Sequence, residues 1–195
     1  ISYIGLPYES DEEKPLTLEE IQKHEGDKGI YPTCEYFTYH GADQGDTVHG
    51  VFGEPAGNGK IRIIGLYKGH ILEEDRYAQA LQNLNVFKGV IDAMPNRNWS
   101  LRMALKFQGI LKIQFFSKRY SENEEYLPGE NEIEVLKVNR DESLQDTVDA
   151  IKNGLFIFPD PNLLTGNDLA LYEEFKFHLT MLVKERSEDE NGKPL

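Results

Sequence analysis

The sequence predicts an α/β domain built on one mixed sheet of about five strands, the first three antiparallel, with helices on both faces. Residues 36–70 contain three short β-forming segments joined by polar turns, which is typical of an antiparallel meander. Residues 73–116 then alternate between helix-like and apolar strand-like segments, which favours parallel pairing. With 195 residues, of which 39% are hydrophobic, the chain can form one such domain with a sizeable core.

Residues 1–34 precede the first strand and are predicted to be a linker or lead-in segment with one short helix. Thr17 is suited to cap that helix, Glu20 three residues later completes a capping box, and Gly26 ends it. So short a helix is marginal unless it packs on something. We assign residues 35–186 to the folded domain and residues 187–195 to a charged tail.

The order of the central elements predicts the topology. The first strand ends near Asp43, and the second and third strands cover residues 47–53 and 61–70. A helix over 73–84, a nearly continuous apolar strand over 86–92, a helix over 95–107 and a strand over 110–116 follow. With right-handed crossovers between the parallel strands, this is the order of an RNase H-like fold.

The C-terminal third is predicted in less regular pieces. Residues 117–132 are polar and form a surface insertion, and residues 133–140 form a short strand or extended segment. A helix over 141–154, a strand-like run over 155–161 and a long helix over 167–186 complete the chain.

The charge distribution bears on possible partners. The net charge is −13, but residues 60–119 hold eleven basic and four acidic side chains, so this window is +7 and the remainder −20. A basic centre could bind phosphate locally, although scattered surface lysines explain it equally well. The sequence has no membrane span, no signal peptide and a single cysteine, Cys34, so a cytoplasmic location is expected.

Two aspartates are the main candidates for chemistry. Asp43 follows the first strand and Asp92 ends the buried fourth strand, and an RNase H-like sheet makes these strands neighbours. Carboxylates at adjacent strand ends can hold two divalent ions, which is the arrangement that hydrolyses phosphodiesters. Asp43 could instead be a turn residue, as Asp46 is expected to be.

Several segments resemble the nuclease domain of bacteriophage terminase large subunits. GADQGDTVHGVFG (41–53) resembles the first acidic strand of that family, and GVIDAMPNRNWSLRMALKF (89–107) resembles its second acidic strand and the following helix. IKNGLFIFPDP (151–161) resembles its C-terminal segment, and IGLPYESDEEKPLTLEEI (4–21) resembles the linker leaving the packaging ATPase. A Walker A motif is absent, because GNGK is not followed by Ser or Thr.

The resemblance implies a metal-dependent endonuclease that cleaves concatemeric viral double-stranded DNA during genome packaging, with two Mg²⁺ or Mn²⁺ ions, in the cytoplasm of a host cell. Asp43 and Asp92 match the first two metal ligands of the family. The third acid either lies beyond this chain or is supplied by one of four residues, with Asp168 and Glu174 preferred; the others are Asp160 and Glu173. The resemblance also implies the portal and the small terminase subunit as partners, which would bind through other regions of the full protein. It does not imply binding to a membrane.

Other residues receive simpler predictions. Lys68, His70, Lys118 and Arg119 are candidate phosphate contacts. His49 and His178 are expected to be hydrogen-bonded structural residues on a strand and on an apolar helix face. Two alternatives stay open: a non-catalytic docking module of a packaging motor, and another RNase H-like nuclease such as an integrase or a junction resolvase.

Overall fold

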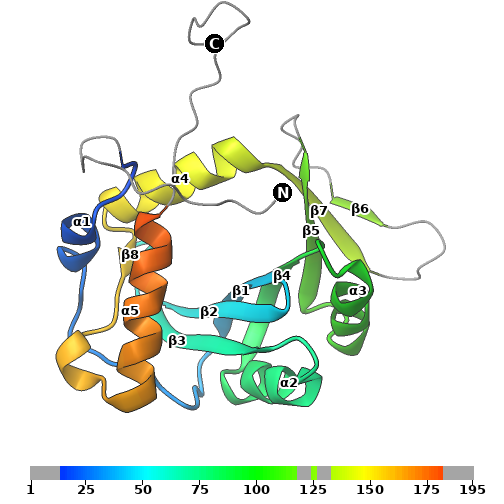
Figure 1. Ribbon diagram of the computed structural model, residues 1–195, viewed down its shortest axis with the longest axis horizontal. Coiled ribbons are helices and arrows are strands. Elements are labelled where there is room, and N and C mark those ends of the chain that lie inside the picture. Colours follow the sequence, from blue (N-terminus) through cyan, green and yellow to red (C-terminus); the bar gives the residue numbers. More distant parts are fainter. Residues whose placement is uncertain (1–13, 118–123, 127–132, 182–195) are drawn as a thin grey trace, which may run out of the picture.

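The fold is an eight-stranded sheet with helices on both faces (Figure 1). The computed structural model describes residues 14–117, 124–126 and 133–181. The strand order is β6-β7-β5-β4-β1-β2-β3-β8. The strands are β1 (Thr38–Gln44), β2 (Thr47–Pro55), β3 (Ile61–His70), β4 (Val86–Asp92), β5 (Leu111–Ser117), β6 (Glu124–Tyr126), β7 (Glu134–Asn139) and β8 (Phe156–Ile157). The helices are α1 (Leu18–Gln22), α2 (Glu74–Asn83), α3 (Arg97–Lys106), α4 (Arg140–Lys152), the 3₁₀ turn η2 (Pro161–Leu163) and α5 (Gly166–Thr180).

The pairing confirms the predicted RNase H-like topology. Strands β1, β2 and β3 form an antiparallel meander. Strand β4 pairs in parallel with β1, β5 with β4, and β7 with β5. The sheet is wider than the five strands expected, because β6, β7 and β8 pair along its two edges. Strand β8 has two residues, which is too short for a periodic signal in the sequence.

Each face of the sheet has its own apolar core. Helices α2 and α3 cover one face through a cluster that includes Phe52, Ile64, Tyr77, Ile91, Trp99 and Met103. Helices α1, α4 and α5 contribute to a second cluster that includes Leu16, Ile21, Ile63, Ile151, Phe158 and Tyr172. In Figure 1, α5 stands beside β2 and β3, and α4 runs from the end of β7 towards α1. Helices therefore lie on both faces, as predicted.

The described part of the lead-in segment, residues 14–34, packs into the second core. Thr17 and Glu20 form the predicted capping box at the start of α1. After α1, Glu25 forms an isolated parallel β-bridge with Phe158, the residue that follows β8. The Tyr172 hydroxyl also donates a hydrogen bond to the Glu25 carboxylate at 3.0 Å. Ile21 is fully buried, so this short helix is held by tertiary packing.

His40 shows how the face toward α2 is held together. Its ring stacks on Phe52, and its Nδ1 lies 3.0 Å from the Val51 carbonyl oxygen. A carbonyl only accepts, so Nδ1 carries the proton and Nε2 accepts from the Tyr77 hydroxyl at 2.7 Å. Burial lowers the pKa of His40 to about 3. The imidazole is thus a neutral structural residue that joins β1 to β2 and α2.

This buried imidazole predicts an acid-dependent loss of stability. A histidine that is neutral in the folded state and protonated in the unfolded state stabilises the fold above its unfolded pKa of about 6.5, and this contribution is lost as pH falls towards the folded value. The free energy of unfolding of wild type should therefore approach that of His40→Gln by about 1 kcal/mol per pH unit between pH 6.5 and 4.5. Urea denaturation measures the difference, and a difference independent of pH would contradict the assignment.

Candidate metal centre

Asp43 and Asp92 lie side by side on neighbouring parallel strands. The register pairs Ala42 of β1 with Ile91 of β4, so the next residue on each strand is one of the two aspartates. Ile91 is fully buried against the α2 and α3 core, and alternation places both aspartates on the opposite face. The sheet therefore brings together the two residues that the sequence singled out.

Side chains from the core fix the backbone at these strand ends. Gln44 donates from Nε2 to the Asp92 carbonyl oxygen at 3.4 Å, and its Oε1 accepts from the Asn96 amide at 3.2 Å. The Ser100 hydroxyl also donates to the Asp92 carbonyl, at 2.6 Å. Gln44 and Ser100 are almost completely buried, so the two carboxylates project from a rigid support.

The Asp92 carboxylate is half-buried, and several neighbouring groups shift its pKa. Burial raises its pKa, the charge of Asp43 raises it further, and a hydrogen bond from the Met94 amide at 3.2 Å lowers it. That hydrogen bond is the kind of local turn contact that the sequence analysis gave as an alternative role for Asp43. The charge of Arg140, the first residue of α4, also lowers the pKa of Asp92. Two adjacent carboxylates, one of them half-buried, form a donor set of hard oxygen ligands that suits a divalent cation.

The aspartates belong to a polar row that crosses five strands on one face of the sheet. The register pairs Lys68 of β3 with His49 of β2, and His49 with Asp43 of β1. On the other side, Asp92 of β4 pairs with Gln114 of β5. The polar row, defined as Lys68, His49, Asp43, Asp92 and Gln114, thus places charged and polar groups next to one another that lie far apart in sequence.

Helix α5 adds Glu174 and His178 to one end of the polar row. Lys68 Nζ donates to both Glu174 carboxylate oxygens, at 2.6 and 2.7 Å, and this contact lowers the pKa of Glu174. His49 Nε2 lies 3.7 Å from Glu174 Oε1, and the His49 and His178 rings meet edge to face with 5.5 Å between centroids. Burial and the neighbouring His178 lower the pKa of His49, which favours the neutral imidazole.

The candidates for a third acid lie in different places. Glu174 contacts the polar row, whereas Asp168 lines a separate cavity with Ile30 and Ala80 at the other end of α5. These two acids are six positions apart, which is about 9 Å along the helix axis. Asp160 caps η2 by accepting from the Asn162 amide, and Glu173 pairs with Lys176. Of the four acids, Glu174 is the one that reaches the polar row.

Two of the four predicted phosphate contacts lie in the described part of the chain. Lys68 lies in the polar row but is bound to Glu174. His70 is exposed at the end of β3, where its Nδ1 accepts from the Leu72 amide. Lys118 and Arg119 lie outside the described residues. The expectation that His49 and His178 are hydrogen-bonded structural residues is not met for His49, because its buried Nε2 has no hydrogen-bond partner in the described part of the chain.

Sequence reasoning missed the roles of His49, His178 and Arg140 in this neighbourhood. The spacing of Glu174 and His178, four residues apart on a helix, was a usable signal that both face the same way. The tight β1–β2 hairpin places His49 opposite Asp43, which was also a local signal, whereas the position of Arg140 depends on where β7 ends.

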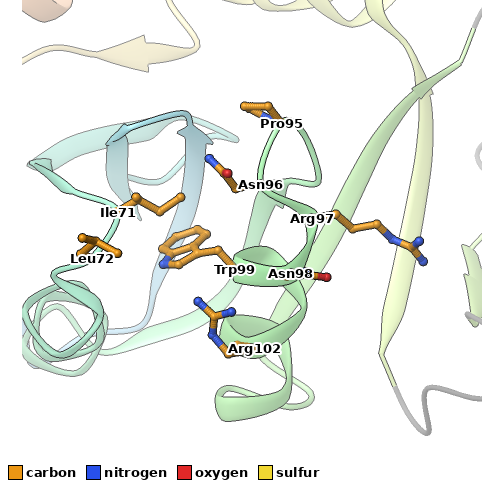
Figure 2. A pocket seen from close by; sticks show the side chains of 8 residues that line it. All are labelled: Ile71, Leu72, Pro95, Asn96, Arg97, Asn98, Trp99 and Arg102. Atoms are coloured by element: carbon orange, nitrogen blue, oxygen red, sulfur yellow. The ribbon is translucent and has the colours of Figure 1, made fainter.

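A hollow beside α3 is distinct from the polar row (Figure 2). It has a volume of about 370 Å³ and lies between the start of α3 and the β3–α2 turn, where Ile71 and Leu72 face Trp99. Arg102, on its edge, is bound to Glu74. The hollow has no carboxylate in its lining, so it does not offer the ligands that a divalent ion requires.

Comparison with known proteins reveals likeness in structure but not in sequence. No family model matches the chain, and no curated protein matches it. The nuclease domain of human cytomegalovirus terminase, soaked with Mn and bound to an inhibitor, aligns with a TM-score of 0.49 and 13% identity over 86% of this chain and 86% of that one. The same domain soaked with Mn aligns at 0.46 and 14%, over 83% of this chain and 86% of that one.

A large terminase from a thermophilic bacteriophage aligns with a TM-score of 0.40 and 12% identity over 68% of this chain. The chain spans 32% of the length of that phage protein. The proposal below rests on the side chains of the polar row, not on these alignments.

Proposed function

We propose that this domain is a metal-dependent endonuclease that cleaves double-stranded DNA during viral genome packaging, in the cytoplasm of a host cell. The observation that carries the proposal is the pair of carboxylates, Asp43 and Asp92, held side by side at the ends of adjacent strands. Divalent ions, Mg²⁺ or Mn²⁺, would supply an activated water and stabilise charge on the leaving oxygen when bound there.

The residues of the polar row have separate roles in this proposal. Asp43 and Asp92 would hold the ions, and the rigid support from Gln44 and Ser100 would keep the spacing of the carboxylates constant when DNA binds. Glu174, which α5 brings to the same face, supplies the third acid once it separates from Lys68. The charge of Arg140, close enough to act on Asp92, attracts the phosphate backbone towards the acids.

Bound ions would also reduce the electrostatic repulsion between the two aspartates. Asp43 and Asp92 raise one another's energy when both are ionised, and burial increases the cost at Asp92. A cation bound between them would offset this repulsion. Binding to portal and small terminase subunit would use other regions of the full protein.

Substrate choice tests the proposal against its alternatives. Incubated with Mn²⁺, the protein should nick supercoiled plasmid and cut linear duplex with little sequence preference, because its candidate ligands act on the backbone. Cleavage is measured on agarose gels, with a four-way junction of the same sequence as a parallel substrate. Strong preference for the junction would favour a resolvase. Absence of cleavage, together with no Mn²⁺ binding by calorimetry, would favour a docking module.

A further inference from the structure

One end of the polar row contains a second set of potential metal ligands, which shares Glu174 with the aspartate centre proposed above and adds two histidines that this centre does not use. His49, Glu174 and His178 each offer one ligand atom, and these three atoms all lie within 4.8 Å of one another. The set differs in kind from the aspartate pair, because two of its three donors are imidazole nitrogens. Imidazole binds transition ions such as Zn²⁺ and Co²⁺ well and Mn²⁺ more weakly, whereas Mg²⁺ prefers oxygen donors.

The fold aims these three side chains at one another from two elements. His49 projects from β2 on the face that α5 covers, and Glu174 and His178 are one helical turn apart on α5. In Figure 1, α5 stands beside β2 and β3, which is the geometry that a site between helix and sheet requires. Strand and helix positions hold ligands more rigidly than loops do.

The His49 ring nitrogen is the observation that points to a ligand. Its Nε2 is buried and has no hydrogen-bond partner in the described part of the chain. The nearest anion, Glu174 Oε1, is 3.7 Å away, too far for a hydrogen bond. A buried polar atom without a partner costs on the order of 1–3 kcal/mol, and a cation bound between the two atoms would give His49 Nε2 its missing partner.

We propose that His49, Glu174 and His178 bind a transition-metal ion such as Mn²⁺, Co²⁺ or Zn²⁺. Three protein ligands of the types His, His and Glu leave a coordination position open for water. The site lies one cross-strand pair from Asp43, because the β1–β2 register pairs that residue with His49. Binding at this site does not depend on nuclease activity.

Lys68 contacts the carboxylate of Glu174, which is one of the three proposed metal ligands. Its ammonium donates to both Glu174 oxygens at 2.6 and 2.7 Å and so occupies the side of the carboxylate that a cation would use. The Lys68 side chain is 44% exposed, so it can move into solvent when a metal ion binds. The metal ion and Lys68 therefore compete for the same carboxylate, and removing the lysine should strengthen metal binding.

One consequence rests on the proposed nuclease function. An ion held by two imidazoles next to Asp43 would give the centre a preference for Mn²⁺ over Mg²⁺, because the nitrogen donors discriminate between these ions where carboxylates alone do so weakly.

Titration of the full chain with Co²⁺, followed by visible absorption, tests the site directly. Wild type should bind Co²⁺ with the absorption of an imidazole-ligated ion, and an excess of Mg²⁺ should not displace it. His49→Gln and His178→Gln should each weaken Co²⁺ binding at least tenfold. Substitutions around metal sites typically reduce metal affinity by roughly 10–100-fold. Lys68→Met should strengthen binding. Asp92→Asn and His70→Gln, outside the ligand set, should leave the absorption unchanged.

The variants separate this site from a structural ion-pair cluster. His178 is exposed, so His178→Gln retains the fold, and circular dichroism checks each variant. Co²⁺ binding that is insensitive to both histidine variants, or weaker in Lys68→Met, would overturn the proposal. Loss of binding in Asp92→Asn alone would assign the ion to the aspartate pair. Co²⁺ binding without DNA cleavage would leave this site intact and reject the nuclease.

Discussion

Replacing Asp92 by asparagine should lower Mn²⁺-dependent plasmid cleavage by about 100-fold or more, since loss of an ion ligand forfeits roughly 3 kcal/mol of transition-state stabilisation. Asn keeps a carbonyl oxygen that can accept from the Met94 amide, so the turn after β4 is preserved. The substitution therefore removes the charge that would bind the ion while keeping the local structure. Initial rates of supercoiled plasmid loss, at saturating Mn²⁺, measure the effect.

Asp46→Asn is the matched control for this experiment. Asp46 is an exposed acid in the turn directly after β1, and the contact it makes with Ile71 uses its backbone carbonyl. Its replacement changes the net charge by the same amount as Asp92→Asn, and cleavage should stay within about twofold of wild type. Equal losses in both variants would mean that overall charge governs DNA binding. Undiminished cleavage by Asp92→Asn would reject the proposed site.

The Asp92→Asn variant should lose activity without losing stability. The pKa of Asp92 is raised by burial and by Asp43, so its ionisation costs folding free energy as pH rises through the folded pKa. In metal-free buffer at pH 7, Asp92→Asn should thus be as stable as wild type or more stable, by a few tenths to about 1 kcal/mol after allowance for its partial exposure. Activity lost without loss of stability distinguishes a functional residue from a structural one.

Replacing Ile21 by alanine should destabilise the domain by about 2–4 kcal/mol, although this residue lies in the short helix of the lead-in segment. The Ile21 side chain is fully buried, in the same cluster as Phe158 and Tyr172. Its removal leaves a cavity between α1 and the helices α4 and α5. Urea denaturation followed by the fluorescence of Trp99, the single tryptophan, measures the change in the free energy of unfolding.

Leu18→Ala provides the control in the same helix. Leu18 is 45% exposed, so its truncation removes little buried surface and should change stability by about 0.5 kcal/mol or less. If residues 14–34 were a linker independent of the domain, both variants would be neutral. A large effect at Ile21 alone would instead make this segment part of the cooperative folding unit.

Much of the fold could be read from local patterns. The meander of β1 to β3, the apolar strand β4 and the helices α2 and α3 follow from hydrophobic periodicity and turn residues, which are properties of neighbouring positions. The capping box of Thr17 and Glu20 is likewise a local signal, and it forms as predicted. The edges of the sheet were less predictable, since β8 has two residues and its pairing with β3 depends on distant packing.

The two aspartates could be identified from the sequence alone, because each lies near the end of a strand and the strand order makes those strands neighbours. Most of their surroundings depend on tertiary packing. The register places His49 opposite Asp43, and the path of α5 brings Glu174 and His178 to the sheet while leaving Asp168 at the far end. The position of α5 is set by packing between segments more than 100 residues apart, as in the pair Lys68 and Glu174, which are separated by 106 positions. No local pattern carries that information, because the free energy that selects it comes from burying both elements together.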